Sequence, residues 1–451
     1  MLILAFFTIL VLSTFYTPLH IIRLTLISIL LSWIIFITTN WLPSFNDGLA
    51  LFNDWLIFYP SNLYFINIIF FTIISLLLYN SFSNNINKFY ALLVIANSLG
   101  LILFPLSNDL ISLYILIELQ SYSLYIMTGI NNKSYNSTKA ALLYFLMGGI
   151  ASCIIILSSY YIYNITGTTN LNEIWAISYQ TDITIFNYLL IFALLFKMGL
   201  APLHKWSLSV YNYAPTYITA YISIVAKISI ITFILTWAST IDTTILYIFF
   251  LSSLFIGAYK PLYEINIKLI LAYSGILNFS YLLLTLIINN SSSIIGFYLY
   301  LSQYVITHIL LFLIILIMGD YQNKITSNWS PVLYIHQLRV PNTTLIGCLI
   351  IALFSLIGLP PLPGFYAKLL VFVGALSSNY ILESLLIVLF SVIATYYYAN
   401  IIKVIIINST ESTKPYISPV LAYFISFTSL SLVLIWTYLD VILRGIYLLT
   451  L

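Results

Sequence analysis

Charged residues are scarce in this chain of 451 residues. Only 6% are Asp, Glu, Lys or Arg, while 62% are hydrophobic and the mean hydropathy is +1.07. A soluble domain needs a charged surface, so this composition excludes a soluble domain of any size. It is typical of an all-α membrane protein with many helical spans.

Cysteine is nearly absent. Cys153 and Cys348 lie in apolar segments far apart in the sequence, which argues against a disulfide, a metal site or an iron–sulfur ligand set. The sequence also contains no P-loop, no GxGxxG after a strand, no metal-spaced His/Cys cluster and no nucleophile elbow. Its basic residues are spread over loops and form no nucleic-acid patch. We therefore expect no cofactor, no metal and no nucleic-acid partner.

Apolar windows of about 20 residues, separated by polar breaks, predict about fourteen transmembrane helices. The N-terminus has no basic region and no small-residue cleavage site, so we expect residues 1–16 to be a retained span. Residues 40–62 are expected to form a surface segment, and the longest loops are 164–183 and 319–340. The predicted spans are 2–17, 21–39, 61–80, 89–106, 109–129, 138–163, 184–206, 214–237, 243–259, 267–289, 292–318, 341–375, 380–407 and 417–439.

The charges in the loops predict the topology. Eleven of the 15 Lys and Arg residues fall in or beside odd-numbered loops, whereas the acidic residues favour even-numbered loops. The eleven are Arg23, Lys88, Lys133, Lys139, Lys205, Lys260, Lys268, Lys324, Arg339, Lys403 and Lys414. By the positive-inside rule, the odd-numbered loops face the cytoplasm or matrix, and both termini lie on the opposite side. A miscounted span would scramble this separation, so it supports the count.

Four charges lie well inside apolar spans, where no loop can accommodate them: Glu118, Lys197, Lys227 and Lys368. Counting along their helices places Glu118 roughly 13 Å and Lys227 roughly 18 Å from a helix end. A charge at the bilayer centre costs about 2.5–3.5 kcal/mol on insertion scales, and such residues usually mark an ion path. His308, within YLSQYVITHILLFLII, is a further candidate.

Two of the predicted spans contain a proline break near a lysine. In LFKMGLAPLHKW, Pro202 follows Lys197 by five residues, and in IGLPPLPGFYAK, Pro363 precedes Lys368 by five. Proline removes a backbone donor, so the freed carbonyl must find a partner or line a hydrated cavity. One break alone is weak, since transmembrane helices tolerate kinks, but two breaks with lysines suggest hydrated, charge-handling sites.

The break-plus-lysine pattern recurs after five helices, from span 7 to span 12. An odd shift reverses direction through the membrane, so we expect two inverted five-helix repeats, spans 4–8 and 9–13, with broken helices 7 and 12. This is a transporter architecture. The predicted organisation is a single transmembrane domain, 1–451, with N-terminal helices in 1–88, the first repeat in 89–237, the second in 243–407 and a C-terminal helix in 417–451.

Glu118 is the carboxylate available to Lys197 at this depth, so we expect an ion pair in a hydrated cavity. Burial disfavours a charged lysine and a nearby carboxylate favours it, so a pair that can be broken lets the lysine gain or lose a proton. Proton transfer requires such a site. The alternatives are snorkelling of Lys197 and Lys368 to an interface, helix packing for Glu118, and a hydrogen-bonded core role for His308.

Five motifs occur in order along spans 5 to 12. They are the Glu118 helix, Lys197 in FKMGLAPLHKW, Pro215-Thr216 followed by Lys227 in SIVAKIS, Lys268 in KLILAYSGI, and GLPPLPGFYAK ending at Lys368. In this order they resemble the antiporter-like subunits of respiratory complex I, most closely the fungal mitochondrial branch. The richness in Ile, Tyr, Phe, Asn and Leu also fits an AT-rich genome such as a mitochondrial one.

The resemblance implies roles for the four charges. In the family, a glutamate and a lysine form a coupled pair, a second lysine lies on a central hydrophilic axis, and a third basic or acidic group serves the second half-channel. By motif position these roles fall to Glu118, Lys197, Lys227 and Lys368, in that order. The family often has a histidine after AYS, which this chain lacks, so a relay there would use Asn278, Ser280 or water.

The resemblance also implies proton translocation across the inner mitochondrial membrane, driven by electron transfer in other subunits. The chain would be a subunit of NADH:ubiquinone reductase with no redox site of its own. Its implied partners are other membrane-arm subunits, including further antiporter-like ones, with lipid, water and protons. The basic odd-numbered loops would face the matrix, and both termini the intermembrane space. A free-standing cation/proton antiporter and a non-pumping structural membrane subunit remain as alternatives.

Overall fold

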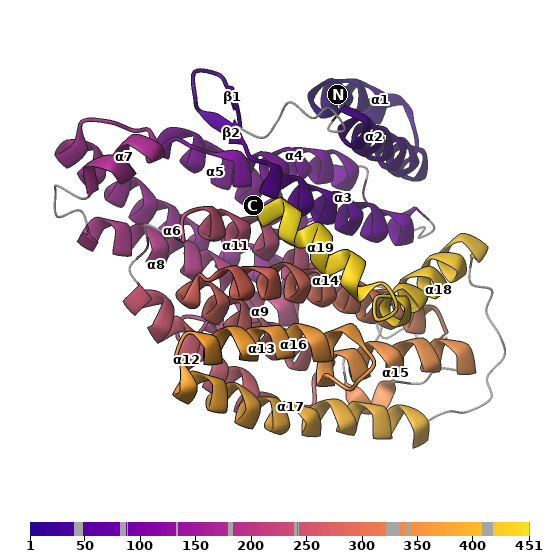
Figure 1. Ribbon diagram of the computed structural model, residues 1–451. Coiled ribbons are helices and arrows are strands. Elements are labelled where there is room, and N and C mark those ends of the chain that lie inside the picture. The colour runs from indigo at the N-terminus through magenta and orange to yellow at the C-terminus, as the bar shows by residue number, and fades with distance from the viewer. Residues whose placement is uncertain are drawn as a thin grey trace. The chain divides into compact units, whose positions relative to one another are not determined.

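The computed structural model describes residues 1–39, 48–81, 87, 89–131, 134–178, 184–238, 241, 243–321, 334–338, 342–407 and 418–450 (Figure 1). Five of the basic residues used for the topology lie outside these ranges: Lys88, Lys133, Lys324, Arg339 and Lys414. The described chain is almost entirely helical, as predicted, apart from one short hairpin. That hairpin lies in the predicted surface segment 40–62 and pairs β1 (Leu49–Leu51) with β2 (Leu56–Phe58).

Ten helices are long and apolar enough to cross a membrane within the described ranges, by length and composition. They are α2 (Pro18–Thr39), α3 (Pro60–Asn80), α4 (Phe89–Leu103) with the 3-10 turn η2 (Phe104–Leu106), α5 (Leu110–Thr128), α6 (Tyr135–Thr166), α10 (Thr216–Tyr221) continued by α11 (Lys227–Thr236), α12 (Thr243–Tyr259) with η4 (Lys260–Tyr263), α13 (Ile267–Ile288), α14 (Ser291–Tyr321) and α17 (Ile381–Ile407). Each corresponds to one predicted span.

The other predicted spans are shorter or interrupted helices. They are α1 (Leu2–Phe15), the pair α8 (Thr184–Met198) and α9 (Lys205–Tyr213), the pair α15 (Thr343–Ile357) and α16 (Pro363–Ser377), and α18 (Pro419–Leu434), from which α19 (Leu439–Thr450) turns away by 84° (Figure 1). The predicted breaks in spans 7 and 12 are therefore confirmed. The prediction missed α7 (Leu171–Ser178), which lies in the predicted loop 164–183, and it ended span 7 before most of α9.

The helix ends are set by familiar capping residues. Asp109 accepts a hydrogen bond from the backbone N–H of Ile111 at the start of α5, and Asn266 accepts one from Lys268 at the start of α13. Such caps satisfy backbone donors that have no partner inside the helix. They fix where α5 and α13 begin, and so which residues of each lie inside the fold.

The chain divides into two units. Unit 1 comprises Met1–Gly199, Leu203–Ala214 and Ile224–Ile245, and unit 2 comprises Leu200–Pro202, Pro215–Ser223 and Leu246–Leu451. The predicted repeats 89–237 and 243–407 fall largely into unit 1 and unit 2, respectively. Within unit 1, α6 packs against α5 and against both halves of the broken span, α8 and α9. Within unit 2, α14 packs in the same way against α13 and against both α15 and α16.

Contacts between loops support an alternating path through the membrane. In unit 1, the Trp55 carbonyl accepts a bond from the Asn108 backbone N–H at 2.9 Å, and the Asn108 side chain bonds Asn170 at 3.1 Å. These residues belong to the second, fourth and sixth loops. In unit 2, Ile335 donates to the Ile265 carbonyl at 3.1 Å, which joins loops nine and eleven. Even-numbered loops thus contact even-numbered loops, and odd-numbered loops contact odd-numbered loops. This is expected if successive helices cross the membrane in opposite directions.

Candidate functional site

The break between α8 and α9 places Lys197 in the last turn of α8. Gly199 ends the helix with a φ of +68°, a conformation that favours glycine, and a cis Ala201–Pro202 bond follows. The Ala201 carbonyl, freed by the break, accepts a hydrogen bond from Ser252 Oγ at 2.8 Å. The break therefore has the partner that an interrupted helix needs in an apolar environment.

Lys197 and Glu118 form a buried ion pair. The distance from Lys197 Nζ to Glu118 Oε1 is 2.7 Å, and the two side chains are 6% and 9% exposed. The predicted pairing is therefore present, and Lys197 does not snorkel to an interface. Removing one partner of a buried pair is costly, about 3–5 kcal/mol, because the other charge is left uncompensated. This energy keeps the Glu118 and Lys197 side chains together until another change in the protein separates them.

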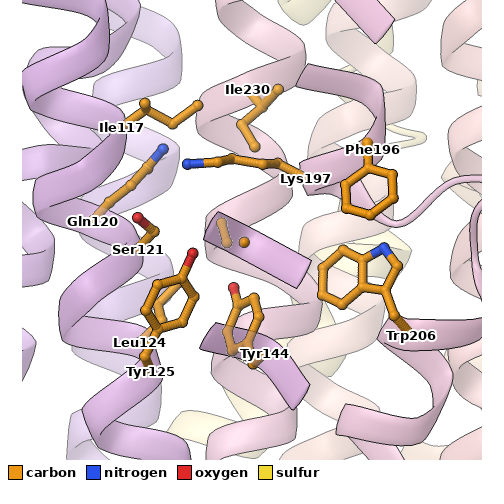
Figure 2. A pocket seen from close by; sticks show the side chains of 12 residues that line it. Ile117, Gln120, Ser121, Leu124, Tyr125, Tyr144, Phe196, Lys197, Trp206 and Ile230 are labelled. Carbon is orange, nitrogen blue, oxygen red and sulfur yellow. The ribbon is translucent and has the colours of Figure 1, made fainter. Parts of the chain in front are cut away.

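A small cavity adjoins the ion pair within unit 1. Its volume is about 20 Å³, room for about one water molecule. Figure 2 shows Lys197 extending towards Gln120, with the hydroxyl groups of Tyr125 and Tyr144 pointing up towards it. The remaining lining residues include Ser121, Phe196, Trp206, Ala226 and Ile230. Most of the lining surface is apolar, and Lys197 is among the few polar side chains that a water molecule in the cavity can contact.

Aromatic packing holds the cavity open. The Tyr144 and Phe196 rings stack on Trp206 with centroids 5.6 and 5.8 Å away, and the Tyr125 ring meets Tyr144 edge-on at 4.7 Å. Gly148 of α6 makes room for the Tyr125 hydroxyl, since a Cβ at that position would overlap it. The indole Nε1 of Trp206 is buried without a protein hydrogen-bond partner, so it is available to a water molecule.

Lys227 lies just after an irregular stretch of its helix. Residues Ile222–Ala226 form a π-helix, a rare geometry that is frequent at functional sites, and Lys227 begins α11. The side chain is 3% exposed, and its Nζ lies 5.6 Å from the centroid of the Tyr211 ring. Two residues on, Ser229 donates a 3.0 Å hydrogen bond to Gln120 Oε1, so α11 is tied to a residue of the Lys197 cavity.

The second break has a different arrangement. Gly358 ends α15 with a φ of +87°, and the Pro360–Pro361 bond is cis. Lys368 Nζ donates to the carbonyls of Leu356 and Ile357 at 2.8 and 2.9 Å. The lysine therefore binds the C-terminal end of α15, whose carbonyls carry partial negative charge. The Lys368 ammonium group is thus bonded within unit 2, and its depth in the membrane stays a prediction.

The breaks repeat in sequence as Gly199-Leu200-Ala201-Pro202 and Gly358-Leu359-Pro360-Pro361. In this alignment Lys197 precedes its break and Lys368 follows its own. The two lysines therefore hold different positions in the two repeats. This explains why one of them faces a carboxylate and the other faces a helix end.

His308 lies on α14 with 1% of its surface exposed. Its Nδ1 is 3.1 Å from the Tyr304 carbonyl, and the two rings are 4.0 Å apart. The Tyr304 hydroxyl donates to the carbonyl of Ser223, a residue of the π-helix, at 3.3 Å. His308 is thus held in a hydrogen-bonded core position, and its part in a proton relay stays a prediction.

Two buried charges were assigned to loops by the sequence. Lys268 is 3% exposed in the first turn of α13, and Glu383 is 9% exposed in the first turn of α17, where the Tyr247 hydroxyl donates to it at 2.7 Å. The signal for Lys268 was Asn266, a capping residue that starts the helix before the lysine. Glu383 had no such signal, because its partner comes from α12.

Comparison with known proteins agrees with this geometry. Residues 107–395 match the family described as NADH:quinone oxidoreductase/Mrp antiporter, TM. NADH-ubiquinone oxidoreductase chain 2 of Debaryomyces hansenii is 47% identical over 451 residues, covering 99% of both chains. The protein of the same name from Candida albicans is 47% identical over 96% of this chain and 91% of its own length.

Solved structures share the fold at lower identity. A chain of respiratory complex I from Thermus thermophilus has a TM-score of 0.83 at 21% identity, covering 98% of this chain and 97% of its own. A chain of the Mrp complex from Dietzia has a TM-score of 0.86 at 18% identity, covering 99% and 95%. The family match, the full-length relatives and the shared fold lead to one conclusion: this chain belongs to the NADH:quinone oxidoreductase/Mrp antiporter family of membrane subunits.

Proposed function

We propose that this chain is a proton-translocating membrane-arm subunit of mitochondrial NADH:ubiquinone oxidoreductase. The observation that carries the proposal is the buried Glu118–Lys197 ion pair beside a small cavity. A structural helix contact needs no breakable charge pair with room for water next to it. The full-length similarity to NADH-ubiquinone oxidoreductase chain 2 proteins supports the choice of complex.

The mechanism follows from what each charged group contacts. A displacement passed on from a neighbouring subunit would separate Glu118 from Lys197, and the buried lysine, without its counter-ion, would give its proton to water in the cavity. Lys227 would take up the proton next, since Ser229 and Gln120 link its helix to that cavity. Lys368 would serve the second half of the route. Electron transfer takes place in other subunits.

The proposed setting is the inner mitochondrial membrane, with the odd-numbered loops on the matrix side and both termini on the intermembrane-space side. The bias of Lys and Arg towards odd-numbered loops supports this orientation. Other membrane-arm subunits, among them further antiporter-like chains, would flank this one. Large exposed apolar side chains such as Phe15, Phe7 and Tyr423, at 80%, 61% and 75% exposure, are available to lipid or to such partners.

The test uses the assembled complex. A native gel of mildly solubilised membranes, stained for NADH dehydrogenase activity and probed for this chain, should show it in a very large active band. In the purified complex, Lys227→Met should lower proton uptake into proteoliposomes several-fold, because a methionine cannot carry a proton. Lys403→Met, which removes an exposed lysine from α17, is the control and should leave uptake unchanged.

Two other functions predict other outcomes. A free-standing cation/proton antiporter would run on the gel as a small inactive species and exchange Na⁺ or K⁺ in liposomes, and the fold shared with the Mrp complex keeps this candidate open. A structural subunit would co-migrate with the active band, but Lys227→Met would then change neither turnover nor proton uptake. Either result would overturn the proposed function.

A further inference from the structure

Gln120 lies between the Lys197 cavity and the helix that carries Lys227. It belongs to α5, is 3% exposed and lines the cavity. In the proposed mechanism it only connects the two lysines. An amide, however, has two different ends, an oxygen that accepts hydrogen bonds and a nitrogen that donates them. The end that faces the cavity therefore decides what the cavity can hold.

Ser229 sets the orientation of this amide. Its hydroxyl, on α11, donates to Gln120 Oε1 at 3.0 Å and to the Ala226 carbonyl at 3.0 Å. Because Ser229 holds the amide oxygen, the amide nitrogen points into the cavity, and Figure 2 shows it facing the ammonium nitrogen of Lys197. Both nitrogen atoms are donors, so neither accepts a hydrogen bond from the other.

The group that fits between the two nitrogen atoms is a water molecule, and the cavity volume of about 20 Å³ has room for about one. A water oxygen has two lone pairs, so it can accept one bond from Lys197 Nζ and one from Gln120 Nε2. With both lone pairs occupied by these donors, the water has none left to take a proton. Lys197 therefore keeps its proton while the amide has this orientation.

A 180° turn of the amide reverses the situation. The terminal torsion of a glutamine side chain is broad, and rotation about it exchanges the oxygen and the nitrogen without changing the volume of the side chain. Oε1 then accepts a bond from the water, and one lone pair of the water becomes available to Lys197. Nε2 then donates to Ser229 Oγ, whose own proton stays on the Ala226 carbonyl. Both orientations thus keep a hydrogen bond between Gln120 and Ser229.

The backbone of Gln120 is held in place by α4. Asn97 Nδ2 donates to the Gln120 carbonyl at 2.7 Å, and a Cβ at Gly100 would come within 2.9 Å of the Gln120 backbone nitrogen. α4 and α5 therefore pack closely at this residue. The amide lies at the far end of the side chain, beside the cavity, so it is the part of Gln120 that can turn.

We propose that the Gln120 amide is a gate for proton transfer from Lys197 and that Ser229 sets its position. With Nε2 towards the cavity, Lys197 keeps its proton. With Oε1 towards the cavity, the Nζ–H bond breaks, the electron pair stays on nitrogen, and the proton joins the water oxygen, from which it passes to Lys227. This inference rests on the proposed function and adds the residue that controls its first transfer.

The π-helix connects this gate to Lys227. Ser229 bonds the carbonyl of Ala226, which is the last residue of the π-helix and lines the cavity. Lys227 follows directly in the chain. A shift in this stretch of backbone moves the Ser229 hydroxyl relative to the amide. The gate therefore responds to the helix that receives the proton.

The experiment compares Ser229→Ala and Gln120→Glu with Ser158→Ala in the purified, reconstituted complex. Ser158 is as fully buried as Ser229, but its hydroxyl bonds the Ile155 carbonyl of its own helix, α6, at 2.8 Å. Ser158→Ala therefore removes the same group without touching the amide. Ser229→Ala and Gln120→Glu should each lower the rate of NADH-driven proton uptake at least threefold, whereas Ser158→Ala should leave it unchanged.

Gln120→Glu separates a gate from a structural contact between α5 and α11. An ionised glutamate keeps an acceptor for the Ser229 hydroxyl, but it presents an oxygen to the cavity at all times and has no donor to present. If Gln120 only joins the two helices, proton uptake in this variant should be normal. Normal uptake in the assembled Gln120→Glu complex would overturn the inference.

Infrared spectroscopy tests the turn of the amide directly. The partner of its C=O group changes from the Ser229 hydroxyl to water, so the difference spectrum between the resting and the NADH-reduced complex should contain a glutamine C=O band. This band should be missing from Gln120→Met. A wild-type spectrum without any glutamine C=O change would overturn the inference even where a variant fails to assemble.

Lys227→Met, measured alongside, separates the two proposals. A loss of uptake in Lys227→Met together with normal uptake in Ser229→Ala and Gln120→Glu overturns only the amide gate. Normal uptake in Lys227→Met overturns the proposed function itself.

Discussion

Glu118→Gln is the most direct perturbation of the proposed mechanism. It keeps the size of the side chain and removes its charge, so Lys197 is left in a buried site without a counter-ion. At the observed separation of 2.7 Å, the lost Coulomb attraction is about 6 kcal/mol for an effective dielectric constant of about 20. The glutamine carbonyl still accepts one hydrogen bond, and water in the adjacent cavity recovers part of the rest.

We therefore expect Glu118→Gln to destabilise the charged form of Lys197 by about 3 kcal/mol, at the lower end of the range for breaking a buried ion pair. That corresponds to roughly a hundredfold change in an equilibrium constant. Coupled NADH:ubiquinone turnover should fall at least tenfold, and proton uptake should fall with it, because the cycle passes through the closed pair.

The assay is proton uptake and NADH oxidation in proteoliposomes containing the purified complex, with a native gel to establish assembly. The matched control is Glu173→Gln, which neutralises an exposed carboxylate of α7 in the same unit and should change neither rate. An assembled Glu118→Gln complex with normal turnover and normal proton uptake would refute the reasoning, because the pair would then have no part in either process.

The remaining predictions concern glycines that make room for the sites. Gly148→Ala should destabilise unit 1 by about 1–3 kcal/mol and reduce proton uptake, because the added methyl group overlaps the Tyr125 hydroxyl; Gly149→Ala, with open space around it, is the control, and equal melting temperatures would contradict the steric argument. Gly358→Ala should likewise cost about 1–3 kcal/mol and disturb Lys368, because the backbone φ is +87° and the new Cβ comes within 3.2 Å of the lysine Cδ. Gly347→Ala is the control: its added Cβ has no neighbour within 4 Å, so it should leave the melting temperature unchanged.

The sequence predicted those parts of the site that conflict with their surroundings. A lysine in an apolar run, and a proline or glycine inside a span, are visible because they are expensive in a membrane. Glu118 could be matched to Lys197 for the same reason: the loops could accommodate the other carboxylates. The two breaks and the ion pair therefore followed from residue types and spacing alone.

Uncharged polar groups gave no such signal. The chain contains 38 tyrosines, and nothing in the sequence separates Tyr398, which lies inside unit 2, from Tyr396, which is exposed two residues earlier. Which face of a helix turns inwards is decided by its neighbours, and the helices here are apolar nearly all round. The lining of the Lys197 cavity and the buried tyrosines of unit 2 therefore required the packed structure. The burial of Lys268 was not predicted because hydropathy windows place a helix start only to within a few residues.

The different surroundings of Lys197 and Lys368 suggest different tasks. Lys197 faces a full negative charge, so its preference for a proton changes as soon as Glu118 moves away, and the pair responds to displacement. Lys368 faces two carbonyls at the end of α15, which hold the nitrogen in place whether or not its third proton is present. An ionised glutamate there would point its oxygens at carbonyl oxygens, acceptor against acceptor, so the two carbonyls favour a charged lysine over a charged glutamate. We infer that the first site gates the proton and that the second passes it on.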